Sequence, residues 1–309
     1  MSHQAIERVA VVVVLLLMPF VVTGVINRVK ALWSGRKGPP ILQSAFDVVR
    51  LLRKGSVYST TTTPLFRIAP WVFLVTSLAS AAVVPLLGST PLAGFSFDFV
   101  WFAYVWGLGR MAIMLAALDT GSSFEGMGAA REATFSTLLE PAWFLVAGAL
   151  CLLVGTHTLH EALAPNLGSG GAVVVWAASI VALLIVLQVE SARMPVDDPT
   201  THLELTMVHE VMVLDHSGPD LAAIQVGAAV KLLIGASLIA TLLNPWAGEG
   251  SLRAALLNLA LVVVVAVVVG TTESLIARFK LRTLPAYIAI AVGAGAVALL
   301  ATTWRAGGP

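Results

Sequence analysis

Charged residues and cysteine are both scarce in this sequence. Of its 309 residues 11% are charged and 58% are hydrophobic, whereas a soluble domain carries about 25% charged residues. The chain therefore lacks the polar surface that a soluble domain needs, and its long apolar runs indicate an all-α integral membrane protein rather than a barrel. Cys151 is the only cysteine. This excludes an intrachain disulfide and a self-contained iron–sulfur cluster, which needs about four thiolates.

Apolar runs long enough to cross a bilayer, about 20 residues each, recur along the chain. The first run is longer than the apolar part of a signal peptide and no small-residue cleavage site follows it, so we interpret it as a spanning helix. No segment of soluble-domain size interrupts the runs, and we expect one membrane domain over 1–309. The sequence predicts about eight spanning helices, at roughly 5–26, 68–87, 96–118, 136–155, 172–192, 221–243, 253–277 and 286–304.

Lysine and arginine are distributed unevenly between the two sides of these helices. By the positive-inside rule the richer side is cytoplasmic, so we expect a multi-pass protein of the inner (cytoplasmic) membrane with both termini outside. The poorer side holds Arg8, Arg253 and Arg305. The richer side holds Arg28, Lys30, Arg36, Lys37, Arg50, Arg53, Lys54, Arg67, Arg131, Arg193, Arg278, Lys280 and Arg282.

The first cytoplasmic loop contains an amphipathic segment. Apolar residues recur at helical spacing between Ile41 and Leu52, and Gln43, Asp47, Arg50 and Lys54 form a polar stripe. This pattern predicts a lateral helix in the membrane surface that begins after Pro39-Pro40 and ends at Gly55. Two interpretations stay open: a basic interfacial anchor, or a helix that binds a cytoplasmic partner.

Several ionisable residues fall inside the predicted spans. A charge at the centre of a spanning helix costs about 2.5–3.5 kcal/mol on insertion scales, so such a residue is a functional candidate by default. Arg110, Glu140, Glu190 and Lys231 are of this kind, and Glu273 lies near the cytoplasmic end of the seventh span. These residues either pair structurally inside the bundle or line a wet path whose carboxylates relay protons.

The stretch from Gln188 to Leu221 holds seven of the 17 acidic residues and three of the six histidines. Thr201 and Glu204 have capping-box spacing, which predicts a helix from about His202 to about His216. On it His202, His209 and His216 share one face at steps of about 10 Å, too far apart to share a metal ion. No two histidines lie deep in facing spans, which argues against haem. A structural polar network and a proton-input funnel facing a redox partner both remain open.

Five segments of the chain resemble one known family. The resemblance is to the H-subunit (subunit 1) family of respiratory complex I, which implies eight spanning helices and a lateral helix. It covers most of the chain and is carried by GRKGPPILQSAFDVVRLLRKG, TPLFRIAPWVF, ALDTGSSFEGMGAAREATFSTLLEP, VESARMPVDDPTTHLELTMVHE and TTESLIARFKLRTLP.

Within that family the chain is similar to the membrane subunits of group 4 membrane-bound [NiFe] hydrogenases of the formate hydrogenlyase and hydrogenase-4 types. The similarity lies in 119–124, in 128–132 and in the run from Arg193 through Glu204 to His209-Glu210. The last run departs from the quinone-reducing branch. Because of this departure the hydrogenase-type subunit is the first interpretation. A quinone-site subunit of a complex I-like NADH or ferredoxin:quinone oxidoreductase is the alternative. A freestanding transporter is a third possibility, although no inverted repeat is apparent.

The resemblance implies a non-catalytic membrane-anchoring and coupling subunit. Its partners would be a [NiFe] hydrogenase large subunit and an iron–sulfur small subunit on the cytoplasmic side, antiporter-like membrane subunits, and lipid, without nucleic acid. The [NiFe] centre and the iron–sulfur clusters would lie in those partners, no metal or other cofactor is expected on this chain, and quinone binding stays open. The resemblance does not specify the electron donor, which could be formate, carbon monoxide, ferredoxin or another. It equally leaves open whether protons or sodium ions move, and in which direction the complex runs.

The implied site residues form two groups. A proton path or coupling role is expected for Glu140, Glu190, Asp197, Asp198, Glu204, Glu210, Asp215, Lys231 and Glu273. A docking role or a structural charge is expected for Arg36, Lys37, Asp47, Arg110, Asp119, Arg131, Glu132, Arg193, His202 and His209.

Overall fold

A computed structural model describes residues 3–164, 170–197 and 207–306. In that part of the chain the regular structure is entirely helical, and eight helices are long and apolar enough to cross a membrane, which confirms the predicted fold class. The elements in chain order are α1 (His3–Trp33), α2 (Gln43–Leu52), α3 (Pro64–Ala82), α4 (Asp98–Asp119), α5 (Ser123–Val154), α6 (Leu159–Ala162), α7 (Gly170–Glu190), η1 (Glu210–Val213), α8 (Gly218–Leu243), α9 (Leu252–Leu275), η2 (Leu281–Thr283) and α10 (Leu284–Ala306).

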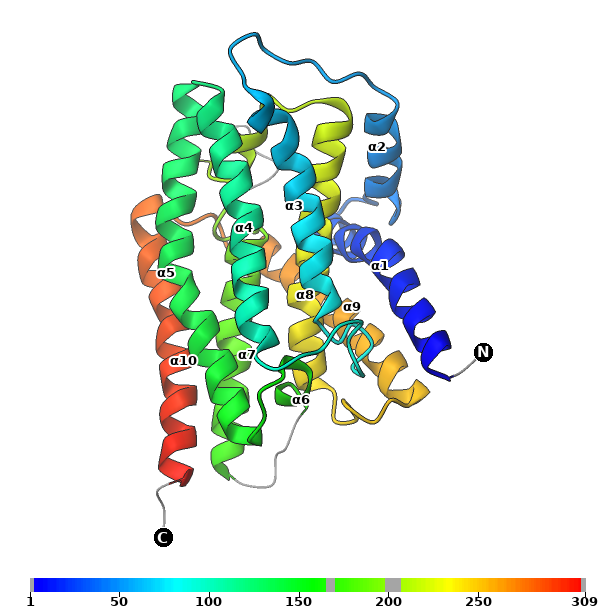
Figure 1. The fold of residues 1–309 in the computed structure, drawn as a ribbon, viewed down its shortest axis with the longest axis vertical. Helices are drawn as coiled ribbons and strands as arrows, with labels where there is room; N and C mark the ends of the chain where they lie inside the picture. The colour runs from blue at the N-terminus through cyan, green and yellow to red at the C-terminus, as the bar shows by residue number, and fades with distance from the viewer. Residues whose placement is uncertain (1–2, 165–169, 198–206, 307–309) are drawn as a thin grey trace.

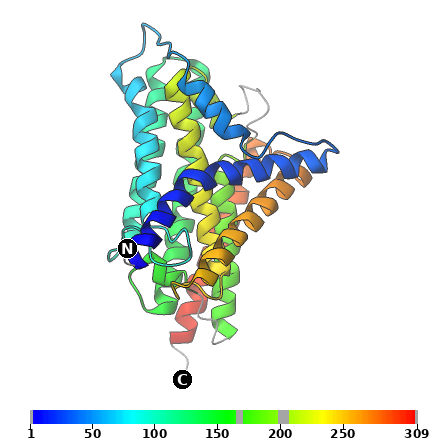
Figure 2. The ribbon, with the colours of Figure 1, turned by 90° about the vertical axis from the view of Figure 1, so that its right-hand side faces the viewer.

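The spanning helices surround α8, which is the most deeply buried of them. It packs against α3, α7, α9 and α1, and α3, α4, α5, α7 and α10 run roughly along the long axis of the bundle (Figure 1). Helix α1 is steeply tilted and converges with α9 at their C-terminal ends (Figure 2). An apolar core links most of these helices.

Local capping explains where α3 begins. The Thr63 hydroxyl oxygen accepts a hydrogen bond from the Leu65 amide at 3.2 Å, and Pro64 occupies the first turn, where a missing N–H costs nothing. Asp119 at the end of α4 accepts from the Thr63 amide at 2.7 Å and from its hydroxyl at 3.0 Å. The carboxylate that we expected to dock or carry structural charge therefore ties α4 to the start of α3.

The amphipathic helix predicted in the first cytoplasmic loop is present as α2. Val48 is buried against the bundle, whereas Phe46 and Val49 are exposed on another side. The polar stripe is held together by Asp47, which accepts from Gln43 Nε2 at 3.0 Å and pairs with Arg50 at 3.3 Å. The helix thus has a packing side, an exposed apolar side and a polar side, and its position in the membrane surface stays a prediction.

The prediction of a helix over about 202–216 is wrong for the residues that the structure describes, 207–216. From 207 onward the chain forms only the short 3-10 helix η1, because Asp197 fixes it from outside by accepting from the Val208 and His209 amides, both at 2.9 Å. His209 and His216 consequently do not share a helix face. Three predicted site residues fall outside the described residues: Asp198, His202 and Glu204.

Helix α5 is longer than predicted. The apolar pattern indicated a span beginning near 136, but the helix starts at Ser123 and has 32 residues. The extra turns carry Glu125 and Glu132, which look like loop residues by composition and are nevertheless buried. They can be helical because both carboxylates find partners on the segment that follows α7, namely the Asp215 amide at 3.2 Å and His209 Nδ1 at 3.2 Å.

Candidate functional site

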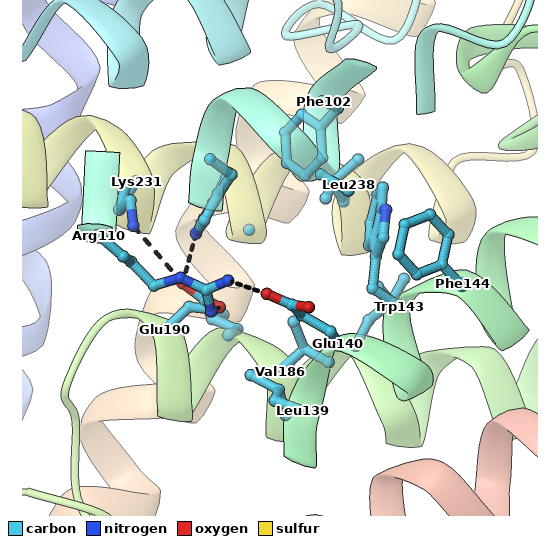
Figure 3. A pocket seen from close by; sticks show the side chains of 15 residues that line it. Phe102, Arg110, Leu139, Glu140, Trp143, Phe144, Val186, Glu190, Lys231 and Leu238 are labelled. Carbon is cyan, nitrogen blue, oxygen red and sulfur yellow. Dashed lines mark hydrogen bonds and ion pairs between the residues drawn. The ribbon is translucent and has the colours of Figure 1, made fainter. Parts of the chain in front are cut away.

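Four of the charges predicted inside the membrane meet in one cluster (Figure 3). Arg110 on α4 contacts Glu140 on α5, with Nη2 and Oε1 2.9 Å apart, and also donates to Glu190 at the end of α7. Lys231 on α8 lies 3.5 Å from the other oxygen of Glu190. Two cations and two carboxylates from four helices therefore neutralise one another. We refer to these four residues as the central ion cluster.

Aromatic side chains enclose the central ion cluster. Trp106, one helical turn before Arg110, donates its Nε1 hydrogen to Glu190. The Lys231 ammonium lies 4.8 Å from the ring centroid of Trp106 and 5.1 Å from that of Phe73, within the range of cation–π attraction. Arg110 and Lys231 are 6% and 2% exposed, so both cations depend on these partners rather than on water.

Small residues let α3, α4 and α8 approach closely enough to form this cluster. A Cβ atom at Gly109 would lie 2.4 Å from the Thr76 hydroxyl oxygen, and one at Gly227 would lie 2.7 Å from the Phe73 ring. Both glycines therefore mark positions where a larger residue would separate the helices. The side chains of Arg110 and Lys231 lie close by on the same helices.

Two cavities meet at the central ion cluster. The larger, about 480 Å³, is lined by Glu132, His209, Glu210 and Arg193 among others. The smaller, about 50 Å³, is mostly apolar and includes Glu140 together with Phe102, Trp143, Val186 and Leu238 (Figure 3). Arg110, Glu190 and Lys231 line both. The cluster therefore separates a polar vestibule from an apolar pocket, and beyond it the side chain of Glu140 is 54% exposed.

A carboxylate–imidazole pair stands in the larger cavity. His209 Nδ1 and Glu132 Oε2 are 3.2 Å apart. Burial opposes the charged form of His209, but the charge of Glu132 and its hydrogen bond outweigh this effect and raise the pKa of His209. This histidine, predicted only as a docking or structural charge, is therefore more readily protonated than an ordinary histidine.

A second group of charges links α1 and α9 to the segment after α7. Glu273, whose side chain is fully buried, contacts Lys30 Nζ at 2.8 Å and Arg193 Nη1 at 3.5 Å. Asp197 pairs with Arg278 Nη2 at 2.9 Å, and Arg131 Nη1 donates to the Met207 carbonyl at 2.9 Å. Arg193, Asp197 and Arg131 thus fix the ends of the segment whose middle is not described, which is a positioning role.

The remaining predicted residues that the structure describes make no hydrogen bond or ion pair with the four residues of the central ion cluster. Asp215 contacts Glu125 through its amide. Asp47 lines the larger cavity from α2, and Arg36 and Lys37 are exposed in the turn after α1. The predicted site therefore divides into a buried centre, a set of structural anchors and an exposed basic turn.

Several functional candidates carry no strong sequence signal. Trp106 is recognisable only by its spacing of four residues from Arg110. Asp220, at the start of α8, accepts from the Tyr58 hydroxyl at 2.7 Å and from Trp71 Nε1 at 3.3 Å. Glu125 is 1% exposed at the start of α5. In both carboxylates the neighbouring sequence resembles an ordinary first helical turn, so their partners become visible only in three dimensions.

Known proteins are similar to this chain in sequence and in fold. The NADH dehydrogenase family model matches residues 6–303. The chain belongs to this family. It is 31% identical to hydrogenase-4 component C of Escherichia coli (strain K12) over 269 residues, which cover 85% of this chain and 82% of that protein. It is 28% identical to formate hydrogenlyase subunit 4 of the same organism over 277 residues, covering 85% and 87%.

Similarity extends to the quinone branch of the family and to a solved complex. The H-subunit of the NADH-quinone oxidoreductase of Methylococcus capsulatus is 26% identical over 255 residues, covering 79% of each chain. A chain in the structure of the membrane-bound sulfane sulfur reductase (MBS), an archaeal respiratory membrane complex, matches with a TM-score of 0.78 at 16% identity, covering 98% of this chain and 100% of that one. The predicted resemblance is confirmed: this is a multi-pass membrane subunit of the complex I-like and hydrogenase-type complexes.

Proposed function

We propose that this chain is the anchoring and coupling subunit of a hydrogenase or formate hydrogenlyase-type complex. A nickel–iron large subunit and an iron–sulfur small subunit would dock on its cytoplasmic side, at α2, at the α4–α5 turn and at 193–220. Antiporter-like subunits would adjoin its membrane-facing side, and the redox centres would reside in these partners. The strongest sequence support is the similarity to hydrogenase-4 component C over 85% of the chain.

The observation that carries the coupling role is the central ion cluster between two cavities. Glu190 is held by Arg110 and Lys231 between the vestibule that contains Glu132, His209 and Glu210 and the pocket that contains Glu140. A charge change near the vestibule would alter how Arg110 and Lys231 divide their attraction among these carboxylates, since charges interact strongly in a medium of low dielectric constant. Proton uptake at the vestibule would thereby be linked to proton release at Glu140, whose side chain is 54% exposed.

The test compares redox turnover with ion transport in the intact complex. The complex is purified through a tag on this chain, its subunits are identified, and Glu190→Gln and Glu140→Gln are assayed in detergent and in liposomes. Each variant should retain hydrogenase activity with an artificial electron acceptor while ion transport falls at least about tenfold, as expected for loss of a proton-transfer group.

Glu249→Gln serves as the matched control because Glu249 is an exposed carboxylate outside the cluster. Transport that survives both cluster substitutions would refute the coupling role. A complex that contains no hydrogenase subunits would refute the assignment to the hydrogenase branch.

The size and lining of the larger cavity favour one alternative, a quinone-site subunit. Its volume of about 480 Å³ lies within the roughly 300–1,000 Å³ of ordinary ligand pockets. Phe73, Met212 and Ile224 supply apolar walls beside the polar groups. Reduction of an added short-chain quinone by the purified complex, abolished by Ile224→Trp, would support this alternative; hydrogen evolution without any quinone reduction would exclude it.

A further inference from the structure

The C-terminal ends of α1 and α9 converge (Figure 2). A basic groove lies there, and none of its described lining residues belongs to the central ion cluster. Its volume is about 750 Å³, and its lining includes Lys30, Trp33, Ser34, Arg36 and Ser274. None of the described residues that line it is a carboxylate. The proposed coupling path does not use this groove.

Two glycines in αL geometry shape the groove. Gly35 ends α1 with φ of 69°, and the Arg36 amide then returns to the Ala31 carbonyl at 2.8 Å. Gly38 also has φ of 69°, and a Cβ there would lie 2.6 Å from Ala31 Cβ and 3.5 Å from Arg28 Cδ. The turn therefore folds tightly back onto α1, which places Arg36 in the same groove as Lys30.

Positive charge exceeds negative charge around the groove. The nearest described carboxylate contact is Glu273, whose side chain is fully buried and already paired with two cations, Lys30 and Arg193. Arg36 adds an exposed guanidinium, a group whose donors match the oxygens of a phosphate. The groove is consequently suited to an anion that approaches from the surface.

Exposed apolar residues occur in the groove and next to its lining residues in the sequence. Trp33 is 55% exposed in its wall, and Leu32 and Leu275, which adjoin lining residues along the chain, are each 63% exposed. Tryptophan concentrates at the headgroup level of membranes, where its ring contacts both apolar and polar surroundings. A ligand that fits both parts has an anionic phosphate at one end and hydrocarbon at the other.

We propose that this groove binds the headgroup of one anionic membrane phospholipid. The phosphate lies between Arg36 and Lys30, and the acyl chains extend along Leu32 and Leu275. Lys30 also contacts Glu273, and Glu273 contacts Arg193. A lipid bound to Lys30 is therefore connected to Arg193 through Glu273. Free inorganic phosphate shares the headgroup chemistry but lacks the hydrocarbon.

The test titrates the full chain in detergent with phosphatidylglycerol and counts bound lipid by native mass spectrometry. The first phosphatidylglycerol molecule should bind with higher affinity than any further phosphatidylglycerol molecules. Arg36→Gln should weaken it about fivefold, which corresponds to the ~1 kcal/mol that a basic residue near anionic lipid contributes. Arg53→Gln is the matched control, because Arg53 is an exposed basic residue near the end of α2 and outside the groove.

Two further titrations separate the sources of phosphate. Phosphatidylcholine, which is neutral overall, should bind at least about fivefold more weakly, and inorganic phosphate should not displace phosphatidylglycerol at equal concentration. Equal effects of Arg36→Gln and Arg53→Gln, equal binding of the two lipids, or displacement by inorganic phosphate would each overturn the proposal. Arg36 is exposed, so its variant folds, and an unchanged melting temperature without lipid verifies this.

Discussion

Arg110 is the residue that contacts both carboxylates of the central ion cluster, Glu140 of α5 and Glu190 of α7. Its guanidinium contacts Glu140 and Glu190 together, and only 6% of the residue is exposed. Breaking a buried ion pair by removing one partner costs about 3–5 kcal/mol, because the remaining charge stays buried without compensation. Arg110 is thus as important for folding as for any proton movement.

Replacement of Arg110 by methionine should lower the stability of the purified chain by about 3–5 kcal/mol. Thermal denaturation in detergent, followed by circular dichroism, measures the loss. The double variant Arg110→Met, Glu190→Gln should recover part of it, because the stranded carboxylate is removed as well. An unchanged melting temperature of Arg110→Met, comparable with that of the exposed-site control Arg53→Met, would contradict the role of Arg110 as the central counter-ion.

His216 predicts an acid-sensitive step in stability. Its ring stacks on Phe66 with centroids 3.9 Å apart, and no described hydrogen-bond partner reaches either ring nitrogen. Burial lowers the pKa of His216 from 6.5 to about 4, against the opposing charges of Asp220 and Asp215. Above pH 6.5 the ring is neutral in the folded and unfolded states, so it contributes no pH dependence there.

Between pH 6.5 and about 4, His216 binds a proton in the unfolded chain but stays neutral in the folded chain. Stability should therefore fall across this window by about 3 kcal/mol, at about 1.4 kcal/mol per unit of pKa difference. His216→Phe keeps a ring on Phe66 and does not titrate, so melting curves of this variant should lose this part of the acid sensitivity. His157→Phe, at an exposed histidine that stacks on Phe97, should retain it; an identical pH profile for both variants would refute the assignment.

At the scale of helices, the close contact of α3, α4 and α8 determines whether the central ion cluster can form. Gly109→Ala places a methyl group 2.4 Å from the Thr76 hydroxyl oxygen, so either this hydroxyl leaves the Val72 and Phe73 carbonyls to which it donates or α3 and α4 separate. Overpacking of this kind costs about 1–3 kcal/mol, and a corresponding fall in the melting temperature is expected.

A second substitution makes the packing prediction specific. Thr76→Ala removes the clashing hydroxyl, and the double variant Gly109→Ala, Thr76→Ala should recover most of the stability that Gly109→Ala loses. Gly148→Ala on α5 is the matched control, because no atom lies within 4 Å of the added methyl group. Failure of Thr76→Ala to rescue would mean that the two helices are not held at this contact.

An element could be predicted from the sequence where its burial leaves a pattern within its own segment. It could not be predicted where contacts with distant segments determine its course. The eight spans and α2 were predictable because their burial, in lipid or against the bundle, produces a long apolar run or a three-sided pattern within one segment. The start of α5 and the course of 207–217 were not predictable. There, Glu132 and Asp197 bind partners from other segments, and tertiary contacts override the local helical signal.

The same distinction applies to the site. The cost of burying charge identifies Arg110, Glu140, Glu190 and Lys231 within the sequence, and they do meet. Their pairing, the interposition of Trp106 and the two cavities depend on how four helices rotate about their axes. Asp119 was predicted to dock a partner or carry structural charge; that its partner is Thr63 at the start of α3 is not visible in the composition.

For the molecule as a whole, the eight candidate spans among the described residues predict that the two termini lie on one side of the membrane. The distribution of lysine and arginine predicts that this side is outside. Alkaline phosphatase fused to either terminus should therefore be active, and green fluorescent protein fused there should be dark, in intact cells. As an internal control, green fluorescent protein inserted after Gly55 should fluoresce. The opposite pattern at both termini would invert the orientation, and with it the assignment of α2 to the cytoplasmic side.

The order of the central ion cluster along the chain bears on how the protein is made. Arg110 is synthesised first, followed by Glu140, Glu190 and finally Lys231. If α4 entered the bilayer alone, its arginine would stay uncompensated, at a cost of about 2.5–3.5 kcal/mol, until α5 supplied Glu140. Each carboxylate then arrives at a cation that is already waiting, and Lys231 comes last to the surplus carboxylate. The order of these charges along the chain, one cation, two carboxylates and one cation, therefore favours insertion of α4 and α5 into the membrane as a pair.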